Sequence, residues 1–139
     1  MIEALRNRSK GFMVQGPLKG REKHQENLCE ELLRERAAVL ARAGFAVEDA
    51  LAKLKRLDRR FGEMMDRWQS LETDAHPLER QSVFEEINEM IDRFNAARQK
   101  AEIQYYYLIV TREALGLRRH ETVQKFYQIP PKKKKMQAL

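Results

Sequence analysis

The sequence contains one cysteine and three histidines, which leaves little room for covalent or metal-based stabilisation. With Cys29 alone, no disulfide can form within the chain. A zinc site would have to bring His24, His76 and His120 together from three distant places. We therefore predict that the chain holds no metal and no cofactor. Cys29 lies among apolar helical positions, so we expect a small core residue there and not a nucleophile.

Recognisable catalytic motifs are also missing. The segment from Gly16 to Gly20 lacks the spacing and the preceding strand of a phosphate-binding loop. No histidine follows a glutamate by three residues, as a di-iron helical bundle requires. We predict that the chain is not an enzyme.

Long apolar runs are absent, since none approaches the roughly 18 residues that are needed to cross a bilayer. The first residues lack the apolar centre of a secretory signal. We therefore expect a cytoplasmic protein without a transmembrane segment.

Glycine and proline are scarce, and only Gly62 and Pro77 lie between Phe45 and Gly116. The residues between them are rich in strong helix formers, and no alternating pattern long enough for a strand occurs. Apolar residues recur at intervals of three and four over residues 21–43, 47–72 and 77–115, which predicts three helices. Gly44 is the expected end of the first helix, and Pro77 is the expected start of the third.

These segments predict an all-α fold, an antiparallel three-helix bundle or coiled-coil-like array with a long third helix. A short helix is expected over residues 119–127. The predicted domain spans residues 21–129, between a flexible N-terminal arm at 1–20 and a basic tail at 130–139. Because Pro130 and Pro131 precede four lysines, we expect that tail to be flexible and hydrated. The predicted buried seam consists of Leu51, Leu54, Phe61, Trp68, Ile87, Ile91 and Phe94.

The most apolar run of the chain, at residues 105–110, lies near the end of the third predicted helix. An antiparallel second helix starting near residue 47 covers the third only to about residue 104, so this run needs another cover. Segment 117–129, a second copy of the chain or a different protein could supply it. The predicted partner-binding residues are Tyr105, Tyr106, Tyr107, Ile109, Val110 and Arg112. The first functional hypothesis is therefore a non-enzymatic adaptor, assembly factor or small chaperone that binds a protein partner or itself.

Charge is distributed unevenly and supports the alternative hypothesis. Residues 1–23 carry a net charge of +4, residues 24–115 carry −4 and residues 116–139 carry +6. Basic ends of this kind attract polyanions, so nucleic-acid binding is the second hypothesis. The predicted polyanion-binding residues are Arg118, Arg119, Lys125, Lys132, Lys133, Lys134 and Lys135.

Overall fold

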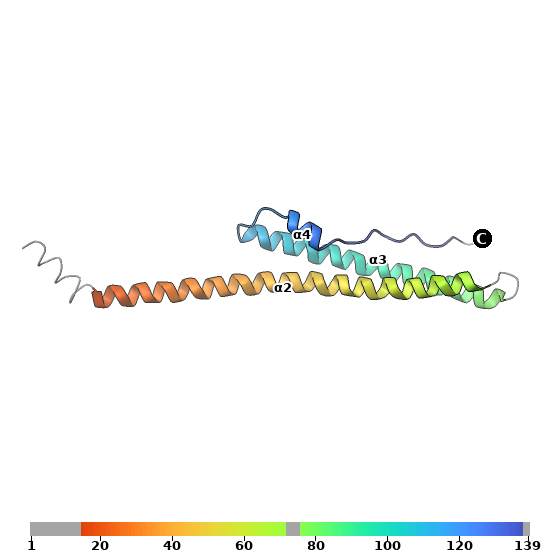
Figure 1. Ribbon diagram of the computed structural model, residues 1–139, viewed down its shortest axis with the longest axis horizontal. Coiled ribbons are helices and arrows are strands. Elements are labelled where there is room, and N and C mark those ends of the chain that lie inside the picture. Colours follow the sequence, from red (N-terminus) through yellow and green to blue (C-terminus); the bar gives the residue numbers. More distant parts are fainter. Residues whose placement is uncertain (1–14, 72–75, 138–139) are drawn as a thin grey trace, which may run out of the picture. The chain divides into compact units, whose positions relative to one another are not determined.

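The computed structural model describes residues 15–71 and 76–137, and it is mostly helical (Figure 1). Two long helices, α2 (Gln15–Ser70) and α3 (Pro77–Ala114), pack together, and α4 (Glu121–Phe126) is short. No strand occurs within the described ranges. The all-α prediction is confirmed at this level.

The predicted helix end at Gly44 is wrong, because α2 is continuous from Gln15 to Ser70. A glycine inside a helix costs only about 1 kcal/mol relative to alanine. The flanking residues are helix formers, and no proline follows to stop the helix. Residues 15–20, which we assigned to the N-terminal arm, belong to the same helix, and the rest of that arm lies outside the described residues.

The chain divides into two compact units, of which the first ends at Val39 and the second begins at Leu40. Within the first unit the described side chains, from residue 20 onward, are exposed. They include Cys29, which we expected in a core, as well as Leu28 and Leu33. The helical periodicity of this segment was read correctly, but its apolar positions are not buried.

The second unit contains the core, which has two clusters. In one, Leu54 of α2 packs with Phe94, Ala97 and Ala101 of α3. In the other, the buried residues Val83, Ile87 and Ile91 of α3 contact partly buried residues of α2. Those α2 residues are Phe61, Met64, Met65, Trp68 and Leu71. Every residue of the predicted seam lies in one of these clusters, although Leu51, Phe61 and Trp68 are only partly buried.

The start of α3 agrees with the prediction, because Pro77 occupies its first turn. Proline fits there, since the first helical N–H groups have no partner within the helix. Arg67 of α2 forms an ion pair with Glu79 at 3.1 Å. Arg80 lies over the Trp68 ring at 3.8 Å and donates to the carbonyl oxygen of Leu71 at 2.8 Å, so α3 also satisfies a carbonyl just after α2.

The end of α3 is a Schellman motif. The N–H of Leu117 donates to the Arg112 carbonyl at 2.8 Å, and the N–H of Gly116 donates to the Glu113 carbonyl at 3.0 Å. Gly116 has a φ of 88°, a conformation that glycine adopts without strain. This turn directs the chain back toward α4 and the C-terminal segment. Within the described residues, no helix is long and apolar enough to span a membrane.

Two glycine substitutions test whether α2 is continuous. A Cβ at Gly44 would lie 3.6 Å from the Tyr127 hydroxyl, an ordinary contact distance. We therefore expect Gly44→Ala to raise the free energy of unfolding by about 0.5–1 kcal/mol. Gly116→Ala should lower it by about 1–2 kcal/mol, because alanine is strained at positive φ. Denaturant unfolding measures both, and an equal loss in the two variants would show that the helix ends at Gly44.

Candidate functional site

The apolar run at residues 105–110 does not form one surface, because its side chains lie on different sides of α3. Leu108 is buried, and Tyr105 and Ile109 are partly buried. Tyr106 and Tyr107 keep 63% and 56% of their surface exposed. The exposed members of the run are therefore the candidates for binding a partner.

Exposed apolar residues form a stripe along this end of α3. Ile103 and Val110 are exposed like Tyr106 and Tyr107. Because residues three and four apart lie on the same side of a helix, the four side chains share one face. We call Ile103, Tyr106, Tyr107 and Val110 the α3 stripe.

The α3 stripe contains only part of the predicted partner-binding set. It includes Tyr106, Tyr107 and Val110, whereas Tyr105 and Ile109 are partly buried beside it. Ile103 was missed, although its spacing of seven from Val110 is visible in the sequence. Scanning back from the apolar run at helical intervals would have found it.

Segment 117–129 covers a different side of α3 from the stripe. A cavity of about 290 Å³ remains where this segment meets the two long helices. Its lining residues are Leu40, Gly44, Leu108, Arg112, Thr122, Val123, Phe126 and Tyr127. Since residues 40 and 44 of α2 reach residues 108 and 112 of α3, α2 extends farther along α3 than the sequence predicted.

Arg112 holds the turn that follows α3. Its guanidinium donates to the Arg119 carbonyl at 2.9 Å and to Nδ1 of His120 at 3.3 Å. Because Nδ1 accepts this hydrogen bond, Nε2 carries the proton and donates to Glu113 at 3.2 Å. The predicted partner-binding arginine therefore makes its contacts within the chain.

Tyr127 attaches the end of α4 to α2. Its hydroxyl donates to the Glu48 carboxylate at 2.8 Å. Burial raises the pKa of Tyr127, and the hydrogen bond to Glu48 and the negative charge of that carboxylate raise it further. The neutral phenol is therefore the form that the folded chain stabilises.

After α4 the chain runs back along α3 without helix or strand, toward the end of α3 that begins at Pro77 (Figure 1). We call residues 128–137 the tail segment. Ile129 packs on the core cluster that contains Leu54 and Phe94, which we call the Leu54 cluster. Met136 packs on the cluster that contains Val83, Ile87 and Ile91, which we call the Val83 cluster. Arg98 donates to the Pro130 carbonyl. The expectation of a hydrated, flexible tail is thus wrong for the described residues 130–137.

Two asparagines of α3 bind the backbone of the tail segment. The side-chain amide of Asn95 donates to the Lys133 carbonyl at 2.9 Å and accepts from the Lys133 N–H at 2.9 Å. Asn88 does the same with Met136, at 3.3 and 2.8 Å. Each asparagine thus satisfies both backbone polar groups of one tail residue.

The spacing of these asparagine pairs matches the geometry of both segments. Asn88 and Asn95 are seven residues apart, which is about 10.5 Å along a helix. Lys133 and Met136 are three residues apart, which is about 10 Å in an extended chain. The two pairs therefore hold the tail segment in an extended conformation and in one register.

The four lysines of the tail segment fall into two classes. Lys133 forms an ion pair with Asp58 at 2.7 Å, and its ammonium group lies 4.3 and 4.6 Å from the ring centres of Phe61 and Phe94. Lys135 forms an ion pair with Asp92 at 3.2 Å. Lys132 and Lys134 are exposed, and so is Lys135, whereas Lys133 is partly buried. Lys133 and Met136, the two tail residues that the asparagines hold, are both partly buried.

The predicted polyanion-binding residues are therefore not one equivalent set. Arg118 and Arg119, just after α3, and Lys125 on α4 are exposed, as are Lys132 and Lys134. Lys133 and Lys135 are paired with carboxylates of the two long helices. Two of the seven cations thus balance acidic groups within the chain.

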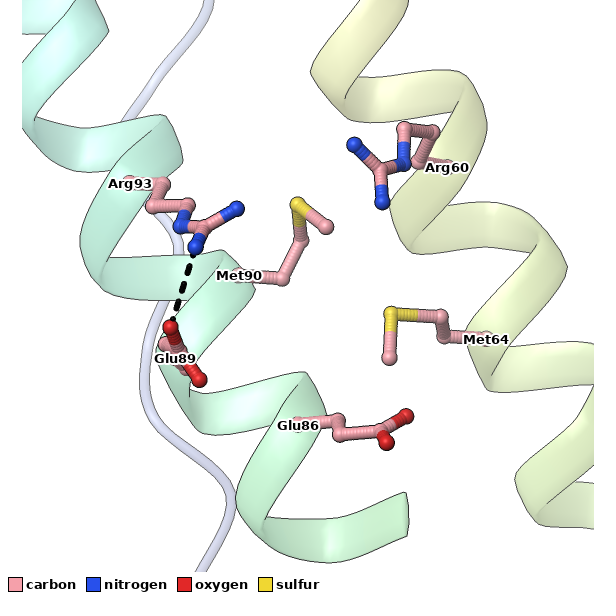
Figure 2. A pocket seen from close by; sticks show the side chains of 6 residues that line it. All are labelled: Arg60, Met64, Glu86, Glu89, Met90 and Arg93. Carbon is pink, nitrogen blue, oxygen red and sulfur yellow. Dashed lines mark hydrogen bonds and ion pairs between the residues drawn. The ribbon is translucent and has the colours of Figure 1, made fainter.

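A smaller cavity of about 230 Å³ lies between α2 and α3 (Figure 2). Met64 and Met90 point into it from the two helices, and Glu89 and Arg93 form an ion pair at 3.1 Å at its edge. Among the residues that the structure describes, no group of three or more His, Cys, Asp or Glu side chains is arranged to hold a metal ion.

Comparisons with protein-family models, curated proteins and solved structures found no match. The functional argument therefore rests on the residues of this chain.

Replacing the tyrosine that anchors α4 tests its docking through pH. Tyr127→Phe should lower the free energy of unfolding by about 0.5–1.5 kcal/mol near neutral pH. The pKa of Tyr127 in the folded chain lies above its ordinary value of about 10. The stabilisation by its hydroxyl is therefore complete below pH 10 and is lost as the pH rises through the pKa of the folded chain. The difference between wild type and variant in chemical denaturation should thus shrink above pH 10. A constant difference, or an equal effect of Tyr106→Phe on the exposed side, would contradict the assignment.

Proposed function

We propose that this chain is a non-enzymatic interaction protein that binds a partner helix, or a second copy of itself, through the α3 stripe. The observation that supports it is the exposure of four large apolar residues on one helix face, after segment 117–129 has covered another face. Exposed apolar surface is costly to leave in water, and contiguous patches of it mark interaction sites. Tyrosine is also enriched among residues that contribute most to protein interfaces.

The spacing of the stripe favours a helical partner. Residues at intervals of three, four and seven are the anchors by which helices pack side by side. The same reasoning describes how the long helices pair within the chain. Residues 50–57 contact residues 94–101, and residues 61–71 contact residues 83–91, which supports an antiparallel, coiled-coil-like pair. A partner helix that packs on the α3 stripe would extend this pair to a group of three helices.

Polyanion binding is the second candidate, and its support is narrower. Arg118, Arg119, Lys125, Lys132 and Lys134 remain exposed and cationic. Lys133 and Lys135 are already paired with Asp58 and Asp92, so binding through all four tail lysines would have to break these pairs. A polyanion that contacts only the exposed residues makes fewer phosphate contacts, and its affinity depends less steeply on salt.

Site-specific photo-crosslinking tests the stripe directly. A photoreactive phenylalanine derivative replaces Tyr107 in one variant and Leu78 in a second variant. Leu78 serves as the control position, since it is apolar and 87% exposed but lies outside the stripe. In cells that express the chain naturally, we expect discrete protein adducts from position 107 and none from position 78. Adducts of twice the chain mass identify a second copy as the partner.

A charge placed within the stripe supplies the control. Val110→Glu should abolish the adducts from position 107, because it places a carboxylate in the contact, while the helix content in circular dichroism stays unchanged. If positions 107 and 78 give the same adducts, or neither gives any, the stripe is not an interface.

A further inference from the structure

The tail segment lies in a groove whose contacts resemble those of a peptide-binding site. We call this the tail groove, and it consists of Asp58 and Phe61 of α2 and Asn88, Asp92, Phe94 and Asn95 of α3. Its asparagines bind only backbone atoms of the tail segment. Such contacts do not depend on which side chains the bound segment carries. They therefore hold any extended segment that enters in the same register.

Side-chain contacts add a pattern to this backbone recognition. The Lys133 ammonium lies between Asp58 and two phenylalanine rings, and its side chain is only 22% exposed. Lys135 pairs with Asp92, and Met136 contacts the Val83 cluster. The side chain of Lys134 is exposed. The groove thus selects lysine at the position of Lys133 and methionine at the position of Met136, whereas the pair of Lys135 with Asp92 lies at the exposed surface, where ion pairs contribute little.

The tail segment does not fill the other end of the groove. Beneath residues 128–131 a cavity of about 550 Å³ remains, with an apolar wall formed by Leu51, Leu54 and Phe94. Ile129 and the two prolines that follow it line this cavity without closing it. A bound segment with a larger apolar side chain at the position of Ile129 would bury more of this wall.

We propose that the tail groove is a binding site for an extended segment of a partner protein, which displaces the chain's own tail segment. The partner segment carries a large aromatic residue at the position of Ile129, lysine at the position of Lys133 and methionine at the position of Met136. Asp58 supplies the complementary charge for that lysine. The aromatic residue gives the partner an advantage over the tail segment, which competes at the high effective concentration of a linked ligand. This site is separate from the α3 stripe and does not depend on the function proposed there.

The test uses the full chain with its own tail segment detached. Lys133→Glu together with Lys135→Glu places like charges against Asp58 and Asp92, and so releases the tail segment. Lys132→Glu together with Lys134→Glu makes the same change in net charge at positions that the tail segment does not use for its ion pairs with Asp58 and Asp92, and leaves the tail segment bound. The probe is a fluorescent peptide with the sequence of residues 128–137, and its binding is measured by fluorescence anisotropy.

We expect the Lys133/Lys135 variant to bind the probe at least about tenfold more tightly than either the wild type or the Lys132/Lys134 variant. Asn88→Leu and Asn95→Leu, added to the Lys133/Lys135 variant, should remove this binding. A probe with Ile129→Trp should bind about tenfold more tightly than the original probe. No binding to a Lys133/Lys135 variant that circular dichroism shows to be folded would overturn the proposal.

Modified probes separate backbone recognition from simple charge attraction. Methylating the backbone nitrogen of the probe at Lys133 removes the donor to Asn95 and keeps every charge, so binding should fall at least about tenfold. Methylation at Lys134 should have little effect, because that residue is not held by an asparagine. Equal binding of both probes would show that only charge attracts the peptide and would overturn the proposal.

A second experiment does not require the Lys133/Lys135 variant to fold. With the wild-type chain, a probe that carries a photoreactive group in place of Met136 is added in large excess over the effective concentration of the tail segment. We expect crosslinks within residues 83–91 of α3, where Met136 packs. Crosslinks elsewhere only, or none, would contradict the proposed site.

Discussion

The pairing of Asn88 and Asn95 with the backbone of the tail segment is the interaction on which the rest of the second unit depends. Two packed helices form a single layer and leave the edges of their shared core open to water. The asparagine pairs hold an extended segment along one edge, where Ile129 and Met136 contact the two core clusters. Four hydrogen bonds to backbone groups also remove the cost of leaving those groups unsatisfied near an apolar surface. The core is therefore built from two helices and one extended segment.

This arrangement also gives two lysines of the basic C-terminal end acidic partners on the long helices. Asp58 and Asp92 flank the groove, and each pairs with a lysine of the tail segment. Lys133 contributes more than charge, since its ammonium also contacts the faces of two phenylalanine rings. Lys132, Lys134 and Lys135 remain exposed. One short sequence thereby supplies both a structural contact and a charged surface.

Sequence reasoning predicted the features that are set locally and missed those set by distant residues. The start of the third helix at Pro77 and its end near residue 115 were predicted correctly, because a helix start and a helix end depend on a few neighbouring residues. The predicted helix end at Gly44 was wrong, because the rule that glycine often ends a helix takes no account of the helix-forming residues on both sides of this position. The contacts of Lys133 could not be predicted from its neighbours in the sequence, because its partners Asp58 and Asn95 are far away along the chain. The repeat of asparagine at a spacing of seven on α3 was the one visible hint, and it gains meaning only beside an extended segment.

Amide hydrogen exchange measured by NMR tests the central claim most directly. The N–H groups of Lys133 and Met136 donate to asparagine side chains, so these two amides should exchange more slowly than those of Lys132 and Lys134. Substituting Asn95 by Leu should abolish the protection at Lys133, because its amide then loses the acceptor. Uniformly fast exchange from residue 131 to residue 137 would contradict the account, because it would show that the tail segment is not held on α3.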